Sequence, residues 1–131
     1  MARPADGGSP DDAAPAVRRL ARAWAKDVAG TSFVPMDRPA LVTFLHGLAA
    51  QLLGALTAEV FDRAVPLRVG AALVDAHFTD ADSIERTLAL LGRELASGPR
   101  TPTGWERLAL LQGAVAAGYS AALLDRTRRE Q

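Results

Sequence analysis

Residues 103–124 read TGWERLALLQGAVAAGYSAALL, and this stretch decides the fold because it predicts one long helix that is apolar on more than one side. Its first residues, Thr103–Glu106, fit the S/T-x-x-E capping box found at many helix starts. The main apolar stripe is expected to contain Trp105, Leu108, Val115, Tyr119 and Leu123. Small residues beside it are Gly113, Ala114, Ala117 and Gly118. Other helices must cover such a stripe, so the stretch predicts an α-helical bundle.

A second long helix is predicted upstream, with Asp37 as its N-cap and Pro39 in its first turn. Its broad apolar face consists of Leu41, Phe44, Leu45, Leu48, Leu52 and Leu56. The opposite side carries the small residues Thr43, Gly47, Ala50 and Gly54. Because small residues let another helix backbone approach closely, we expect this helix to be buried on two sides.

Three further helices complete the pattern. One follows Asp11 or Asp12 and runs to about Ala29, a short one starts at Pro66, and one begins at the capping pattern Asp82–Glu85. Their inward positions are expected to be Val17, Leu20, Trp24, Val28, Leu67, Gly70, Ala71, Val74, Phe78, Ile84, Leu88, Leu91 and Leu95. Alternating strand patterns are absent from the sequence. The predicted fold class is therefore all-α, a single-domain bundle of about five helices, with a globin-like arrangement as one variant.

The two ends of the sequence differ in composition and in their tendency to form helix. Residues 1–15 are rich in Pro, Gly, Asp and Ala, which predicts a disordered leader before a helical domain over residues 16–131. The last residues, LLDRTRREQ, stay favourable for helix with no Gly or Pro to stop them. We therefore expect the natural protein to continue beyond Gln131, with a frayed natural terminus as the alternative.

Composition narrows the classes of function. The 131 residues have a formal net charge of zero, which argues against binding to nucleic acid or to an anionic membrane. The absence of cysteine excludes disulfides and thiolate metal sites. No run approaches 18 uninterrupted apolar residues, and the N-terminus lacks an apolar signal-peptide region, so a cytoplasmic protein is expected.

Catalytic motifs are also missing from the sequence. Phosphate-binding loops, nucleophile elbows and zinc-protease motifs are all absent, so the chain is not expected to be an enzyme or to hold a metal. The candidate ligand-binding residues are His46, His77, Trp24 and Phe33. Either histidine has the chemistry to ligate haem iron, although boundary or capping roles are favoured for both. Likewise Trp24 is first a core residue, and the segment from Phe33 to Met36 is favoured as a cover for the end of the bundle.

Three segments carry a resemblance to a known family. They read RRLARAWAKDVAGTSFVPM, VGAALVDAHFTDADSIERTLALLG and ERLALLQGAVAAGYSAALLDRTRREQ. Together they resemble the helical region that precedes the PAS, GGDEF and EAL domains of actinobacterial, Streptomyces-type, bifunctional diguanylate cyclase/phosphodiesterases. The resemblance covers about residues 17–131. It implies a regulatory input or dimerisation region of a protein that makes or degrades cyclic-di-GMP, and the catalytic GG[DE]EF and EAL motifs are not in this sequence.

The leading hypothesis is thus a sensory or dimerisation domain that pairs with a second copy and passes a signal through its C-terminal helix. The expected interface residues are Leu110, Leu111, Gly113, Ala117, Gly118, Ala121 and Leu124. No cofactor is predicted. The first alternative is a helical sensor that binds haem or another small ligand, and the second is a module that acts on another protein in trans.

Overall fold

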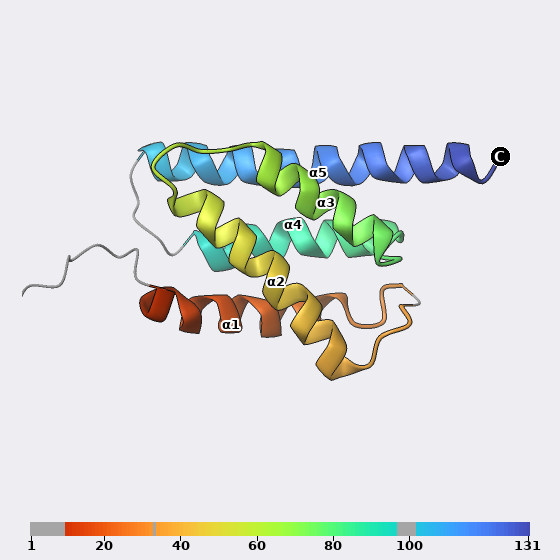
Figure 1. Ribbon diagram of the computed structural model, residues 1–131, viewed down its shortest axis with the longest axis horizontal. Helices are drawn as coiled ribbons and strands as arrows, with labels where there is room; N and C mark the ends of the chain where they lie inside the picture. Colours follow the sequence, from red (N-terminus) through yellow and green to blue (C-terminus); the bar gives the residue numbers. More distant parts are fainter. Residues whose placement is uncertain (1–9, 33, 97–101) are drawn as a thin grey trace, which may run out of the picture.

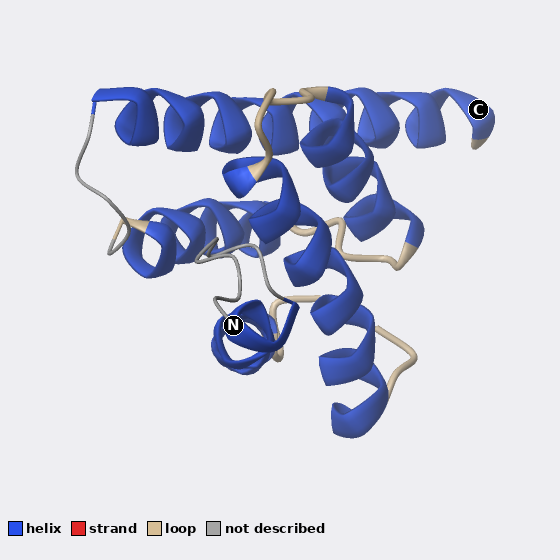
Figure 2. Cartoon of the chain, turned by 60° about the vertical axis from the view of Figure 1, so that its left-hand side comes forward, coloured by secondary structure: helices blue, strands red, loops and turns tan. Residues whose placement is uncertain are grey.

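The computed structural model describes residues 10–32, 34–96 and 102–131, and within these ranges the chain forms five α-helices and no strand. The helices are α1 (Pro10–Val28), α2 (Arg38–Thr57), α3 (Ala64–Asp75), α4 (Ala81–Leu95) and α5 (Pro102–Arg129). This confirms the predicted all-α class and the single-domain bundle of about five helices. In Figures 1 and 2, α4 lies between α1 and α5, while α2 and α3 pass across one side of this stack.

Helix α1 supplies one wall of the core. All four residues of its predicted stripe, Val17, Leu20, Trp24 and Val28, are buried. The helix is followed by Gly30 at φ +81°, a left-handed conformation that glycine adopts without steric cost. Helix α1 runs from Pro10 to Val28, close to the predicted helix from Asp11 or Asp12 to about Ala29, and so it includes residues 10–15 of the expected leader. Residues 1–9 of the expected leader lie outside the described residues.

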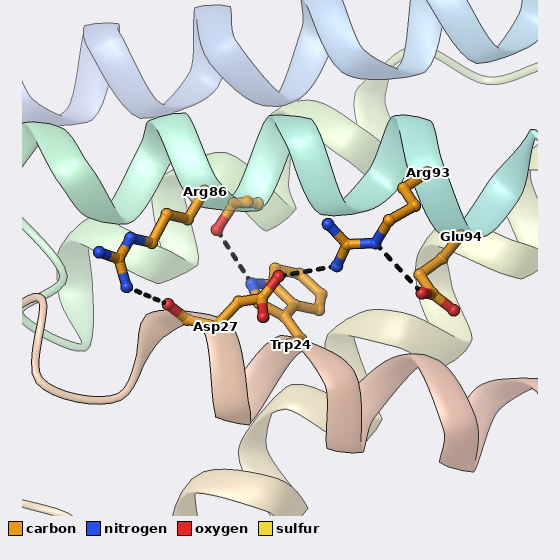
Figure 3. Close-up of polar contacts among 6 residues, drawn as sticks. Trp24, Asp27, Arg86, Arg93 and Glu94 are labelled. Atoms are coloured by element: carbon orange, nitrogen blue, oxygen red, sulfur yellow. Dashed lines mark hydrogen bonds and ion pairs between the residues drawn. The ribbon is translucent and has the colours of Figure 1, made fainter.

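Polar contacts join α1 to α4 along a seam that the sequence pattern did not indicate (Figure 3). The indole N–H of Trp24 donates to the Thr87 hydroxyl over 2.9 Å, and both groups are buried. Nearer the surface, the Arg93 guanidinium binds the carboxylate of Asp27 over 2.8 Å. Arg86 donates to the backbone carbonyl of Asp27 over 3.1 Å. The tryptophan therefore places a large apolar ring in the core with its one polar atom satisfied.

The link between α1 and α2 is fastened by hydroxyl groups. The Thr31 hydroxyl donates to the Val28 carbonyl over 2.7 Å and lies 2.7 Å from the Ser83 hydroxyl at the start of α4. Ser32 is bonded to the same serine over 2.9 Å. Beyond these residues, Val34 and Met36 pack against the core, as expected for a segment that covers the end of the bundle. Phe33 lies outside the described residues.

Helix α2 begins as predicted, because the Asp37 carboxylate accepts a hydrogen bond from the backbone N–H of Ala40 over 2.9 Å. The expectation that α2 is buried on two sides is wrong. A Cβ atom at Gly47 or Gly54 would meet nothing within 4 Å, and Thr43 and Ala50 are exposed as well. Only the leucine-rich face of α2 packs against neighbouring helices.

Close backbone packing occurs instead between α3 and α5, at two glycines. A Cβ atom at Gly118 would overlap the carbonyl oxygen of Leu67 and lie 2.8 Å from its carbonyl carbon. On the other side of this contact, a Cβ atom at Gly70 would lie 2.6 Å from the backbone nitrogen of Tyr119. Each helix therefore rests on the bare backbone of the other, a geometry that only glycine permits at these positions.

The starts of α4 and α5 differ from the capping predictions. The N-cap of α4 is Asp80, whose carboxylate accepts from the Asp82 N–H, so the helix begins before the predicted Asp82–Glu85 pattern. Helix α5 begins at Pro102, which places Thr103 inside the helix. Trp105 is 50% exposed because it lies to one side of the buried stripe, so its assignment to that stripe is wrong.

Candidate functional site

An apolar groove between α4 and α5 is the candidate functional site, with a volume of about 500 Å³. Its lining residues are Ile84, Leu88, Ala116, Tyr119, Ser120, Leu123, Leu124 and Thr127. Leu124 is 52% exposed although it is a large apolar residue. The lining residues come from both helices, two from α4 and the rest from α5, and most of them are apolar.

The groove continues onto the outer face of α5, which consists of Leu110, Gly113, Ala117, Ala121 and Leu124. Leu110 is 48% exposed, and Gly113 and Ala121 are exposed as well. Between Arg107 and Asp125 the sequence contains no charged residue, so this part of the helix carries no charge that would repel a copy of itself. Beyond the groove the C-terminal turns of α5 extend past the rest of the bundle (Figure 1).

The expected interface residues divide into two groups. Gly113, Ala121, Leu110 and Leu124 are exposed, and Ala117 is half-buried. Leu111 and Gly118 are corrected, because both are buried within their own subunit. Leu111 belongs to the hydrophobic core, and Gly118 carries the contact with α3, so neither is accessible to a second chain.

Several groove residues had been assigned to the inner faces of their helices. Ile84, Leu88 and Leu123 follow the same helical spacing as fully buried leucines, but all three are half-buried. The spacing identifies the apolar side of each helix. How much of that side is buried depends on how closely α4 approaches α5. An apolar stripe wider than one neighbouring helix can cover was the signal that could have found the groove.

Tyr119 contributes a polar group to the groove wall, beside the hydroxyls of Ser120 and Thr127. Its hydroxyl donates to the backbone carbonyl of Asp80 over 3.3 Å, which ties α5 to the start of α4. Burial raises the pKa of Tyr119 above its ordinary value, and the negative charge of Asp80 adds to this shift. The phenol is therefore held in its neutral form, in which it donates this hydrogen bond.

The predicted ligand-binding residues are not brought together. Trp24 is fully buried, with its indole N–H bonded to Thr87, so it offers no group to a ligand. His77 follows the end of α3 at φ +75°, and its backbone N–H donates to the backbone carbonyl of Val74 over 2.9 Å. Its imidazole Nδ1 lies 3.3 Å from Nη1 of Arg126, at the surface. His77 thus occupies a helix-capping position.

His46 is exposed on α2, in a separate groove of about 280 Å³ that it shares with Arg18, Arg22, Val42 and Thr43. Only one of these lining residues is apolar. This setting differs from a haem pocket, which surrounds an apolar macrocycle with apolar side chains. Phe33, the remaining candidate, lies outside the described residues.

The described residues form no evident metal site, and two of the helices are long and apolar. Among the described residues, no group of three or more histidines or acidic residues is placed to hold a metal ion. By length and composition alone, α2 and the Thr103–Arg129 part of α5 are apolar enough to cross a membrane. A third of each apolar window is buried inside the bundle.

Comparison of the sequence and the structure with protein-family models, curated proteins and solved structures found no match.

Proposed function

We propose that this chain is a helical regulatory domain that pairs with a second copy of itself through the groove and the outer face of α5. The single observation that carries the proposal is the exposed Leu124 beside an apolar groove, on a helix without charge between Arg107 and Asp125.

A surface that pairs with its own copy must be complementary to itself. In a two-fold interface the same patch faces its own copy, so a charged patch would meet its own charge and be repelled. The outer face of α5 avoids this repulsion. Gly113 and Ala121 are small enough to let two helix backbones approach, while Leu124 of one copy has the size to enter the apolar groove of the other.

Transmission of a signal is the second part of the proposal. A helix that contacts both its own bundle and a second copy moves with both, so a small rotation of one subunit is carried along α5. On the basis of the sequence resemblance, we further propose that this domain belongs to a protein that makes or degrades cyclic-di-GMP. In such a protein this domain would set how two copies of the catalytic domains lie relative to each other.

Sedimentation equilibrium of the wild-type protein and two variants tests the pairing. Leu124→Arg places a charge at the proposed interface, and it is expected to raise the dimer dissociation constant by at least about a hundredfold. Val60→Arg is the matched control, because Val60 is 78% exposed outside the helices and away from the groove. This control should dimerise like the wild type.

Two results would contradict the proposal. A wild-type protein that remains a strict monomer at high micromolar concentration would remove the dimer. Equal weakening by Leu124→Arg and Val60→Arg would show that general charge, rather than the outer face of α5, controls association. Far-UV circular dichroism of each variant checks that the bundle remains folded.

A further inference from the structure

A second surface feature lies away from the proposed interface, where α2 packs across α1 (Figure 1). The groove here has a volume of about 280 Å³. Arg18 and Arg22 line it from α1, while Val42, Thr43 and His46 line it from α2. Residues far apart in the sequence thus place two guanidinium groups, a hydroxyl and an imidazole around one hollow.

The two arginines have no partner within the part of the chain that the structure describes. Both are exposed, and neither forms a hydrogen bond or an ion pair with another described residue. Some arginines elsewhere are engaged, since Arg93 binds Asp27 and Arg107 donates to the carbonyls of Leu56, Ala58 and Glu59. Arg18 and Arg22 are distinguished by lining one hollow together with free guanidinium groups.

Acidic side chains are absent from the described lining of the groove, and α2 has neither Asp nor Glu along its length. Asp27 on α1 is engaged by Arg86 and Arg93 on the α4 side. Arg18 and Arg22 are four residues apart on one helix, a spacing at which like charges repel. A bound anion would relieve this repulsion.

The geometry points to a binding site for a small phosphate-bearing anion in this groove. Arginine offers paired N–H donors that match the oxygens of a phosphate, and such charge-assisted hydrogen bonds are among the strongest in proteins. Thr43 adds a hydroxyl donor and His46 a ring nitrogen, while Val42 contacts an organic substituent. The volume suits a phosphate monoester with a short substituent and is too small for haem or a dinucleotide.

The test measures binding of two soluble probes, inorganic phosphate and glycerol 3-phosphate, by ¹⁵N chemical-shift titration at constant ionic strength. Saturable shifts are expected at residues of the groove. Arg18→Gln and Arg22→Gln should each weaken binding by at least about tenfold, because each removes charge-assisted hydrogen bonds. Arg19→Gln is the matched control, since Arg19 is an exposed neighbour on α1 that does not line the groove. It should bind like the wild type.

A parallel arm separates a soluble ligand from a lipid headgroup. Co-sedimentation with vesicles containing phosphatidic acid tests the same phosphate group on a membrane, and Arg18→Gln should again reduce binding where Arg19→Gln does not. Binding to the vesicles alone would identify the lipid as the source of the phosphate. Absence of saturable binding in both arms overturns the proposal. Equal losses in Arg18→Gln and Arg19→Gln also overturn it, because they show binding to general positive charge.

Discussion

Replacement of Gly118 by alanine is expected to destabilise the bundle, although alanine favours the helix at most other positions. A Cβ atom at residue 118 would lie 2.8 Å from the carbonyl carbon of Leu67, where ordinary contacts are 3.4–4 Å. The obstacle is backbone, which cannot rotate away as a flexible side chain does. Helices α3 and α5 must therefore move apart, and the packing around Gly70 on the other side of the contact loosens with them.

The size of the effect follows from two opposing terms. Alanine gains about 1 kcal/mol of helix propensity over glycine. Overpacking a tight contact costs about 1–3 kcal/mol, and a clash with backbone belongs at the upper end. We expect Gly118→Ala to lower the free energy of unfolding by about 2 kcal/mol. Gly54→Ala is the matched control, because a Cβ there meets nothing within 4 Å and should raise stability by about 0.5–1 kcal/mol.

Urea denaturation followed by far-UV circular dichroism measures both variants, with the slope against urea concentration checked for constancy. The predicted difference between Gly118→Ala and Gly54→Ala is about 2.5–3 kcal/mol, the sum of the expected loss and the expected gain. If Gly118→Ala proves as stable as Gly54→Ala, the close contact between α3 and α5 is not present in solution. Gly70→Ala examines the other side of that contact and should also be destabilising.

Three further predictions concern the core and the helix ends. His77→Gly should raise the free energy of unfolding by about 1 kcal/mol in urea denaturation, because His77 has φ +75°, and an unchanged or lower value would contradict the strain. Trp24→Phe should cost about 1–3 kcal/mol, because the buried Thr87 hydroxyl loses its donor; a double-mutant cycle with Thr87→Val should give a coupling energy clearly above zero. Tyr119 is the single tyrosine, so an ultraviolet titration should show its pKa above the ordinary value of about 10 in the folded state and near that value in urea. Because the pKa of Tyr119 is higher in the folded state, this residue contributes to stability below a pH of about 10, and the contribution is lost as the pH rises through the folded-state pKa. An identical titration midpoint in the folded and unfolded protein would refute this.

Much of the fold could be predicted because the helices follow simple periodic patterns. The stripe from Val17 to Val28 is buried as expected, and Asp37 caps α2 as expected. Both depend on neighbours along the sequence, through helical spacing and a local hydrogen bond.

The errors arise where the outcome depends on residues far apart in the sequence. Gly54 and Gly118 look alike within their helices, but only Gly118 meets another backbone, because α3 crosses α5 at that point. Trp24 is bonded to Thr87 on α4, a pairing that no local pattern indicates.

At the candidate site, too, features set by the local sequence could be predicted and features set by distant residues could not. Leu124 is an expected interface residue, and in the structure it is exposed and lines the groove. Leu111 was placed on the same interface, but it is buried because the core reaches further around α5 than one stripe. The charged groove at Arg18 and Arg22 was not predicted, since it requires the crossing of α1 and α2.

A dilution series of ¹⁵N-labelled wild-type protein tests pairing through α5, because concentration-dependent shifts locate association on the surface without any substitution. We expect these amide shifts to cluster on the outer face of α5, at Gly113, Ala117, Ala121 and Leu124, and on Leu88 across the groove. Arg19 on α1 should not shift. A spectrum that does not change with concentration, or shifts that cluster on α1 and α2 instead, would contradict the claim that copies of this chain meet through α5.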